Sequence, residues 1–354
     1  MNALSPIFAT MTVPADDISA AEAEHVARTH WHLDTAAKLL TGERDRNFHL
    51  VAKDGSTYVL KFANPAEPPG VTDLQVKALQ HVARTDPAFN IPRMIPLPDG
   101  AIEALVPRAP QGTVRPARVR LLSWVHGTPL RHAPRTAAQR ESCGRALARL
   151  GLALQGFDHP HSRYELIWDL TNALSLREIL HNLEDTQAET AIGNLLDAFE
   201  RQAAPILPAL RHQVFYNDMN TGNTLIDPAR PDDVAGIIDF GDVVHTALAI
   251  DVAVGAITCV APDMPIPESL ARFVAGFHAV RPLLPDEVAL LPLLIAVRAA
   301  IGTVLQAWHR KLHADNPHYP PMTAAALQSR LDLIAALRAP EVGAALRQAC
   351  GIVP

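Results

Sequence analysis

A polar segment between residues 214 and 242 carries three side chains whose types could support chemistry. Asp218 precedes Asn223 by five residues, and Asp239 directly follows a run of apolar residues. A carboxylate can accept the proton of an attacking hydroxyl, and amide and carboxylate oxygens are hard ligands of the kind that Mg²⁺ binds. Each residue alone is equally well explained as a turn former or a strand cap. The three together favour a site that binds a metal ion and removes a proton.

This spacing matches the pattern by which phosphoryl-transfer enzymes of the kinase class place their reactive groups. Such enzymes need a positioned hydroxyl and neutralised phosphate charge more than covalent help. On this interpretation Asp218 is the base, while Asn223 and Asp239 hold Mg²⁺. The flanking sequence predicts short apolar strands interrupted by a glycine-containing loop and a proline-containing turn. These strands are expected at residues 214–216, 224–226 and 234–238.

An upstream β-hairpin supplies a candidate phosphate ligand. The Asp54-Gly55 pair predicts the hairpin turn, and Lys61 lies on the second strand. A lysine at the inner end of a strand can reach nucleotide phosphates, although a lone strand lysine is more often solvated. The polar turn before the hairpin lies where a phosphate-covering loop is expected, and a charged surface turn explains it equally well. Its candidate ligands are Arg44, Arg46 and Asn47.

Two further segments are expected to support nucleotide binding. A helix after the hairpin should carry the residue that pairs with Lys61, and its candidates are Asp73 and Gln75. Asp73 is explained equally well as a first-turn residue that complements the helix dipole. Beyond a strong apolar strand lies the expected hinge between two lobes. Main-chain groups of Ser123 and Val125 in that hinge can pair with a purine base.

Two apolar helices of the C-terminal half each contain a charged residue. Asp251 lies in the first, at residues 248–260, and a buried carboxylate needs a partner. We interpret Asp251 as an anchor for the loop that carries Asp218. The second, at residues 288–308, is long enough to span a membrane but has Arg298 at its middle. Because a central charge is costly in a lone membrane span, we expect a buried core helix.

The order of elements predicts the fold class. Strands crowd the first third of the chain and helices dominate afterwards, which is typical of a bilobal α+β protein. The β-rich, nucleotide-binding lobe is expected at residues 1–124, and the mainly helical catalytic and substrate-binding lobe at residues 125–354. A helix capped near Ser19 opens the smaller lobe, and residues up to Asp17 are expected to be loose. Further strands are expected at residues 35–40, 48–52, 58–62, 95–98, 102–106 and 118–125, and further helices at residues 71–84, 137–154 and 186–201.

Composition excludes several other classes of protein. Hydrophobic residues make up 48% of the chain and the net charge is −6, which argues against general nucleic-acid binding. The three cysteines are far apart, so neither a zinc site nor a disulfide framework is indicated. A reducing compartment fits this cysteine content, and the N-terminal residues do not resemble a signal peptide. We therefore expect a cytoplasmic protein with a small-molecule substrate and no membrane partner.

From about residue 35 onward the chain resembles the aminoglycoside phosphotransferase and choline kinase class, a branch of the protein-kinase-like fold. Asp218 and Asn223 match the His-Gly-Asp-x-x-x-x-Asn loop of that class, in which Tyr216 and Asn217 replace the His and Gly. Within the class the chain is most similar to hydroxylysine kinases and to the related domain fused to class III aminotransferases. The segments that carry this similarity are residues 42–48, 58–62, 167–170 and 237–242.

The resemblance implies roles for the residues named above. Asp218 would be the base, Asn223 and Asp239 the ligands of Mg²⁺, and Lys61 a contact of ATP or GTP. Tyr216 is expected to brace the catalytic loop in place of the missing His.

The nature of the acceptor follows from the charges around Asp218. An ammonium group would require carboxylates, and Trp168 could add a cation–π contact. A substrate carboxylate would require an arginine, for which Arg298 is the candidate, unless Arg298 forms an internal salt bridge to Asp251. The acidic candidates are Asp158, Asp169 and Asp242.

These observations predict transfer of the γ-phosphoryl group of ATP or GTP to the hydroxyl of an amino alcohol or hydroxy amino acid, with 5-hydroxylysine first. An aminoglycoside, homoserine or choline-type kinase is the alternative within enzymes. The C-terminal third has no dense acidic run, which disfavours polycationic aminoglycosides. The alternative from another class is a catalytically silent nucleotide-binding module, which the intact set of candidate residues disfavours.

Overall fold

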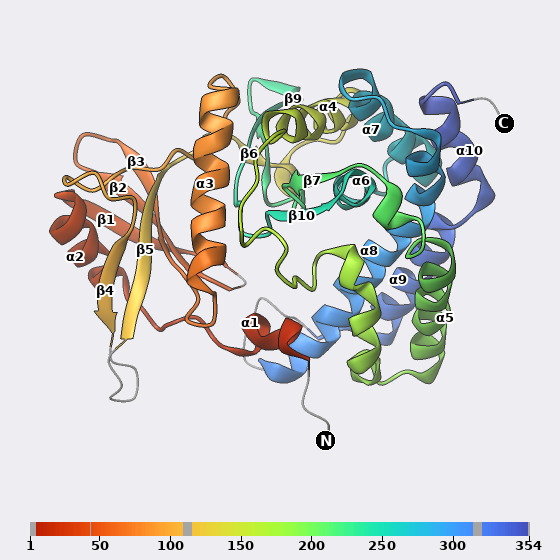
Figure 1. The fold of residues 1–354 in the computed structure, drawn as a ribbon, viewed down its shortest axis with the longest axis horizontal. Coiled ribbons are helices and arrows are strands. Elements are labelled where there is room, and N and C mark those ends of the chain that lie inside the picture. Colours follow the sequence, from red (N-terminus) through yellow and green to blue (C-terminus); the bar gives the residue numbers. More distant parts are fainter. Residues whose placement is uncertain (1–4, 43, 109–114, 314–320, 353–354) are drawn as a thin grey trace.

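The computed structural model describes residues 5–42, 44–108, 115–313 and 321–352. A β-rich part, built from the first third of the chain, lies beside a larger and mainly helical part (Figure 1). The α+β, two-lobed architecture predicted from the order of elements is therefore confirmed.

A single antiparallel sheet forms the centre of the β-rich part, with strand order β1-β2-β3-β5-β4. The turn between β2 and β3 contains Gly55, whose φ of 86° lies in the left-handed region that favours glycine. The strands are β1 (Thr35–Leu40), β2 (Arg46–Ala52), β3 (Thr57–Phe62), β4 (Ala104–Arg108) and β5 (Arg115–Ser123).

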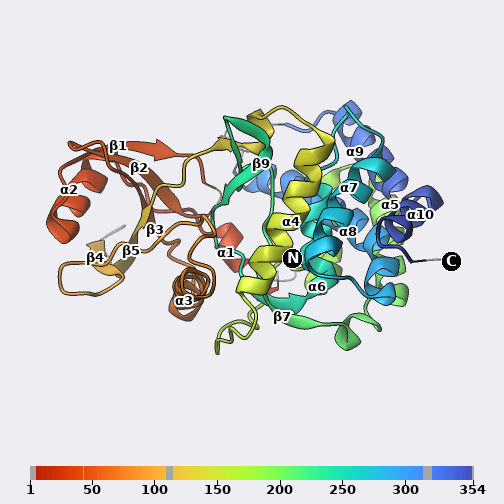
Figure 2. The same cartoon turned by 90° about the horizontal axis from the view of Figure 1, so that it is seen from above.

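The two faces of this sheet have different surroundings. Helix α2 (Ala20–Trp31) begins with a capping box on Ser19, as expected, and covers one face (Figures 1 and 2). Phe48 and Leu60 pack in the apolar cluster that α2 shares with the sheet. Because side chains alternate along a strand, their neighbours in the sequence point to the opposite face. Three polar residues on this opposite face are paired across β2, β3 and β5: Asn47, Lys61 and Arg120.

Helix α3 (Pro69–Thr85) lies between the sheet and the helical part (Figure 1). Its buried residues Leu74, Ala78 and Val82 belong to the large hydrophobic cluster of the helical part. This helix therefore joins the two parts through apolar packing.

The helical part also contains two small antiparallel sheets, β6-β8-β9 and β10-β7, which carry the loops of the candidate site. Its strands are β6 (Thr128–Pro129), β7 (His212–Phe215), β8 (Thr224–Asp227), β9 (Arg230–Ile237) and β10 (Val244–Ala247). Its α-helices are α4 (Ala137–Ala153), α5 (Thr186–Gln202), α6 (Leu248–Ile257), α7 (Ile266–Val280), α8 (Pro285–Leu312), α9 (Ala324–Leu337) and α10 (Pro340–Ala349). Short 3₁₀ segments are η3 (Leu130–His132), η4 (Leu170–Glu178), η5 (Leu180–Leu183) and η6 (Leu207–Ala209).

Helix α8 is long and apolar enough to cross a membrane by length and composition alone. However, 72% of its most apolar window is buried inside the protein. It packs against α6, α9 and α10. The expectation of a core helix is thus confirmed.

Two sequence-based expectations about the first third of the chain were wrong. Residues 95–98 form no strand, because Pro96 and Pro98 lack the N–H groups that a ladder requires. The segment before Asp17 is also not loose throughout: η1 (Pro6–Phe8) and α1 (Ala9–Thr12) contribute buried residues to the large cluster. The Phe8 ring packs edge-on against Trp308 of α8 at 5.1 Å.

Candidate active site

The loop between β7 and β8 is fixed at three points. The Tyr216 hydroxyl donates to the carbonyl of Ile238 at 2.5 Å, which ties this loop to the one that begins at Asp239. The main-chain N–H of Asn217 donates to Oδ1 of Asp251 at 2.8 Å. The Thr258 hydroxyl donates to the carbonyl of Met219 at 2.7 Å. Tyr216 and Asp251 therefore make the bracing contacts expected of them.

Asn217 and Asp239 both have a φ of 58°, in the left-handed region. Asparagine and aspartate tolerate this conformation better than other non-glycine residues. The two strained positions open the two loops that face each other in the candidate site.

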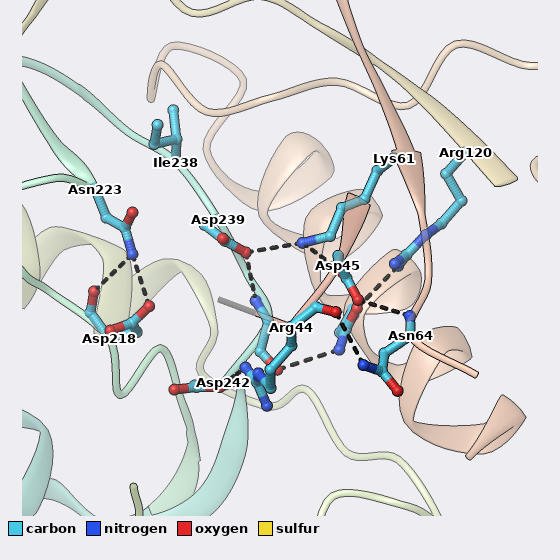
Figure 3. A network of polar contacts seen from close by, with 12 residues as sticks. Arg44, Asp45, Lys61, Asn64, Arg120, Asp218, Asn223, Ile238, Asp239 and Asp242 are labelled. Carbon is cyan, nitrogen blue, oxygen red and sulfur yellow. Dashed lines mark hydrogen bonds and ion pairs between the residues drawn. The ribbon is translucent and has the colours of Figure 1, made fainter. Parts of the chain in front are cut away.

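Two side-chain amides hold the Asp218 carboxylate. Asn223 Nδ2 donates to Oδ2 at 2.6 Å (Figure 3). Asn220 Nδ2 donates to Oδ1 at 2.9 Å. Burial and the negative charges of Asp242 and Asp239 raise the pKa of Asp218 well above its ordinary value. The carboxylate is thus oriented and has a high affinity for a proton, as a general base requires.

Lys61 and Asp239 meet between the two parts of the protein. Nζ of Lys61 lies 3.0 Å from Oδ1 of Asp239 and 3.1 Å from Oδ2 of Asp45. Burial disfavours the charged form of Lys61, but attraction to the carboxylates of Asp239 and Asp45 is stronger. The pKa of Lys61 is therefore raised. Burial also opposes ionisation of Asp239, but Lys61 outweighs it and lowers the pKa of Asp239. Both groups are therefore held in their charged forms.

The side-chain oxygen atoms of Asn223 and Asp239 suit a hard divalent cation. Because Asn223 turns its nitrogen toward Asp218, its amide oxygen points away from that carboxylate (Figure 3). Asp239 adds a carboxylate, and Asp242 adds negative charge nearby. Among the described residues, no three His, Cys, Asp or Glu side chains form a metal-binding group. The residues present fit a cation that takes its remaining ligands from phosphate oxygens and water.

The turn between β1 and β2 reaches into the site through Arg44, which was an expected candidate, and through Asp45, which sequence reasoning missed. Arg44 forms an ion pair with Asp242, and Asp45 pairs with Lys61 (Figure 3). Arg46 instead pairs with Asp17 at 3.3 Å on the α2 side of the sheet. The nucleotide role expected for Arg46 is therefore wrong, because strand alternation turns it to the other face.

Helix α3 does not supply the partner of Lys61. Asp73 pairs with His159 at 3.0 Å. Gln75 accepts from Arg120 at 2.9 Å and donates to the main-chain carbonyl of Gly241 at 3.1 Å. The expectation that Asp73 or Gln75 pairs with Lys61 is corrected, although Gln75 still links both parts of the protein.

The two hinge residues expected to contact the base, Ser123 and Val125, differ in their main-chain hydrogen bonds. The N–H of Ser123 donates to the carbonyl of Arg93 at 2.8 Å, so it is not available to a base. By contrast, the main-chain groups of Val125 make no hydrogen bond to any other described residue. Val125 is the better candidate for contact with a purine.

The expected substrate residues fall into three groups. Asp169 is buried and accepts hydrogen bonds from the Thr171 N–H and from the Thr246 hydroxyl at 2.8 Å, so it caps η4. The substrate role expected for it is therefore wrong. Asp242 faces the site but is paired with Arg44.

Arg298 and Trp168 form the third group of expected substrate residues, and they contact each other. The Arg298 guanidinium lies 4.4 Å from the centroid of the Trp168 ring. This face of Trp168 thus supports an arginine rather than a substrate ammonium group. The positive charge of Arg298 acts to lower the pKa of Asp218. Arg298 therefore lies near the proposed base. Sequence reasoning also missed Tyr164, whose side chain is half-buried and lies near Asp242.

Residues 35–283 match the family model described as the phosphotransferase enzyme family, APH. The chain belongs to this family. Hydroxylysine kinase of Mus musculus is 25% identical over 305 residues, and the alignment covers 80% of each protein. Hydroxylysine kinase of Bos taurus is 26% identical over 299 residues, or 79% of each protein.

Solved structures show the same fold. A microcompartment-associated aminopropanol kinase has a TM-score of 0.68 at 19% identity, covering 91% of this chain and 96% of that one. Amicoumacin kinase in complex with AMP-PNP, Ca²⁺ and Ami has a TM-score of 0.65 at 12% identity, covering 90% and 92%. This member of the phosphotransferase family is a small-molecule kinase that acts on an alcohol acceptor.

Proposed function

We propose that this phosphotransferase moves the γ-phosphoryl group of ATP or GTP to the hydroxyl of an amino alcohol or hydroxy amino acid, with 5-hydroxylysine as the first candidate. The observation that carries the proposal is the position of Asp218. Two amides orient its carboxylate, and the Lys61–Asp239 pair lies across the same site. A hydroxyl placed against Asp218 faces the phosphate-binding groups, as in-line transfer requires.

Each residue has a separate task in this proposal. Asp218 accepts the hydroxyl proton as the acceptor oxygen bonds to the γ-phosphorus and the bond to the leaving nucleoside diphosphate breaks. Lys61 binds the non-transferred phosphates, and Val125 contacts the base. Asn223 and Asp239 would hold Mg²⁺, which neutralises phosphate charge when bound.

The acceptor is proposed from the relatives and from the charges of the site. Hydroxylysine kinases align with about four-fifths of the chain. A hydroxy amino acid has a carboxylate, and Arg298, stacked on Trp168 near Asp218, offers a cation for it. Asp242 is a candidate for the ammonium group after it exchanges Arg44 for the substrate. We also propose a lobe boundary near residue 125, a cytoplasmic location and Mg²⁺ as the resident cation.

A coupled assay of ADP and GDP release tests the function. We would offer hydroxylysine, homoserine, choline, ethanolamine, threonine and kanamycin with Mg-ATP or Mg-GTP. The proposal predicts the highest kcat/KM with hydroxylysine. Preference for kanamycin or choline would assign a different acceptor. Absence of turnover with every acceptor, in a protein that still binds Mg-ATP, would favour a silent nucleotide-binding module.

A further inference from the structure

We infer that Asp45, in the turn between β1 and β2, is the carboxylate that positions Lys61, in place of an acid on α3. This inference rests on the proposed function, because it assumes that Lys61 binds nucleotide phosphates. It concerns a positioning residue, since Asp45 acts through Lys61.

The geometry of the pair supports this role. Oδ2 of Asp45 lies 3.1 Å from Nζ of Lys61 (Figure 3). The Asp45 side chain is 15% exposed and that of Lys61 is 13% exposed, so water screens the pair weakly. Lys61 has a second carboxylate contact in Asp239, but that residue is the proposed metal ligand. Asp45 is the partner that metal binding leaves available.

Asp45 is itself held in place. Its other oxygen, Oδ1, accepts from the main-chain N–H of Asn64 at 2.8 Å. The buried Asn64 side chain donates to the carbonyls of Arg44 and Val13, both at 2.9 Å. One oxygen of Asp45 is thus fixed by the main chain beyond β3, which leaves the other for Lys61. The carboxylate is presented by the turn and does not depend on a mobile side chain.

Helix α3 is occupied with other partners. Asp73 pairs with His159. Gln75 is neutral, and its amide contacts Arg120, Glu67 and the Gly241 carbonyl at 2.9, 3.0 and 3.1 Å. A neutral amide cannot supply the charge that Lys61 needs, so α3 holds Arg120 instead.

This arrangement has a functional consequence. The residue before Asp45 is Arg44, which pairs with Asp242 across the site. One turn therefore positions the phosphate-binding lysine and contacts the acceptor side at the same time. Movement of this turn would withdraw the carboxylate from Lys61, whereas movement of α3 alone would not.

Asp45→Asn tests the inference, because asparagine keeps an oxygen for the Asn64 N–H and removes the charge beside Lys61. We expect KM for Mg-ATP to rise about tenfold with little loss of thermal stability. Asp45→Glu should recover part of this loss. The matched control is Asp73→Asn, which removes a carboxylate from α3 and should leave KM for Mg-ATP within about twofold of the wild-type value.

A double-mutant cycle with Lys61→Met distinguishes an effect of Asp45 that acts through Lys61 from a general loss of structure at the site. If Asp45 acts through Lys61, Asp45→Asn should weaken Mg-ADP binding in the wild-type background and have little further effect in Lys61→Met. Additive losses, or an unchanged KM in Asp45→Asn, would overturn the inference. Calorimetry with Mg-ADP needs no acceptor. A wild-type protein that binds Mg-ADP but phosphorylates nothing would refute the proposed function while the cycle still tests Asp45.

Discussion

At the scale of single residues, the site depends on amides that orient charged groups. Asn220 and Asn223 hold the two oxygens of Asp218, and Asn64 holds Asp45. Such contacts satisfy carboxylates without neutralising them, so the charge remains available for chemistry. Tyr216 adds a neutral brace between the two loops of the site.

Replacing Asp218 by Asn removes the proposed base and keeps its shape. We expect kcat to fall by about 10²- to 10⁴-fold, with Mg-ATP affinity nearly unchanged. The variant loses the repulsion between Asp218 and the carboxylates of Asp242 and Asp239, but it also loses one of the two hydrogen bonds from Asn220 and Asn223. Because these changes oppose each other, we expect a melting temperature close to that of the wild type. Steady-state kinetics and a thermal-shift assay measure both effects. Turnover at the wild-type rate would eliminate Asp218 as the base.

Asp251 makes stability depend on pH. Burial raises its pKa to about 7, against the opposing effects of the Asn217 N–H and Arg281. Between the ordinary value of 3.8 and about 7, the folded state binds more protons than the unfolded state, so stability falls as pH rises. In that window Asp251→Asn should gain stability over the wild type by up to about 1.4 kcal/mol per pH unit.

Urea unfolding at several pH values measures this gain. Asp286→Asn, which replaces an exposed carboxylate on α8, controls for the loss of a charge. A stability difference between Asp251→Asn and the wild type that stays constant from pH 4 to pH 7 would contradict the assignment.

At the scale of elements, α4 and α7 pack through glycine. A Cβ atom on Gly144 of α4 would lie only 2.0 Å from the carbonyl oxygen of Phe273 on α7. Helix α4 also contacts β9, the strand that leads to Asp239. Gly144→Ala should therefore destabilise the fold by about 1–3 kcal/mol.

The matched control is Gly193→Ala on α5, where a Cβ atom would meet nothing within 4 Å. This substitution should be neutral or stabilise by about 0.5–1 kcal/mol, since alanine favours a helix interior. Urea unfolding measures both variants. Equal stabilities would show that the α4–α7 contact adapts to the added methyl group.

The sequence could predict those parts of the site that depend on local order. Asp218, Asn223 and Asp239 follow one another in a single strand–loop–strand segment, so spacing alone brings them together. Asp45 pairs with Lys61, and Arg120 lies opposite Lys61 on β5, because β2, β3 and β5 form one sheet, which no local pattern shows. One signal was available: alternation from Phe48 places Arg46 on the α2 face.

At the scale of the whole molecule, the N-terminal segment belongs to the helical part. Phe8 is 1% exposed and packs against Trp308, and the N–H of Ser5 donates to Glu178 at 3.0 Å. Phe8→Ala should cost about 3–5 kcal/mol of unfolding free energy. Val13→Ala, at a more exposed position nearby, should change stability by less than about 0.5 kcal/mol. Similar urea midpoints for the two variants would contradict the packing described here.

Because the N-terminal segment packs on the helical part, a label on it can report motion of that part relative to the sheet during turnover. A fluorophore attached at Ser5 would move with the helical part, against which the segment packs. A second fluorophore at Asp54, in the exposed turn between β2 and β3, would move with the sheet. Energy transfer between the two dyes would measure the distance between the sheet and the helical part. The transfer signal would follow each opening and closing event in a single molecule as nucleotide enters and product leaves.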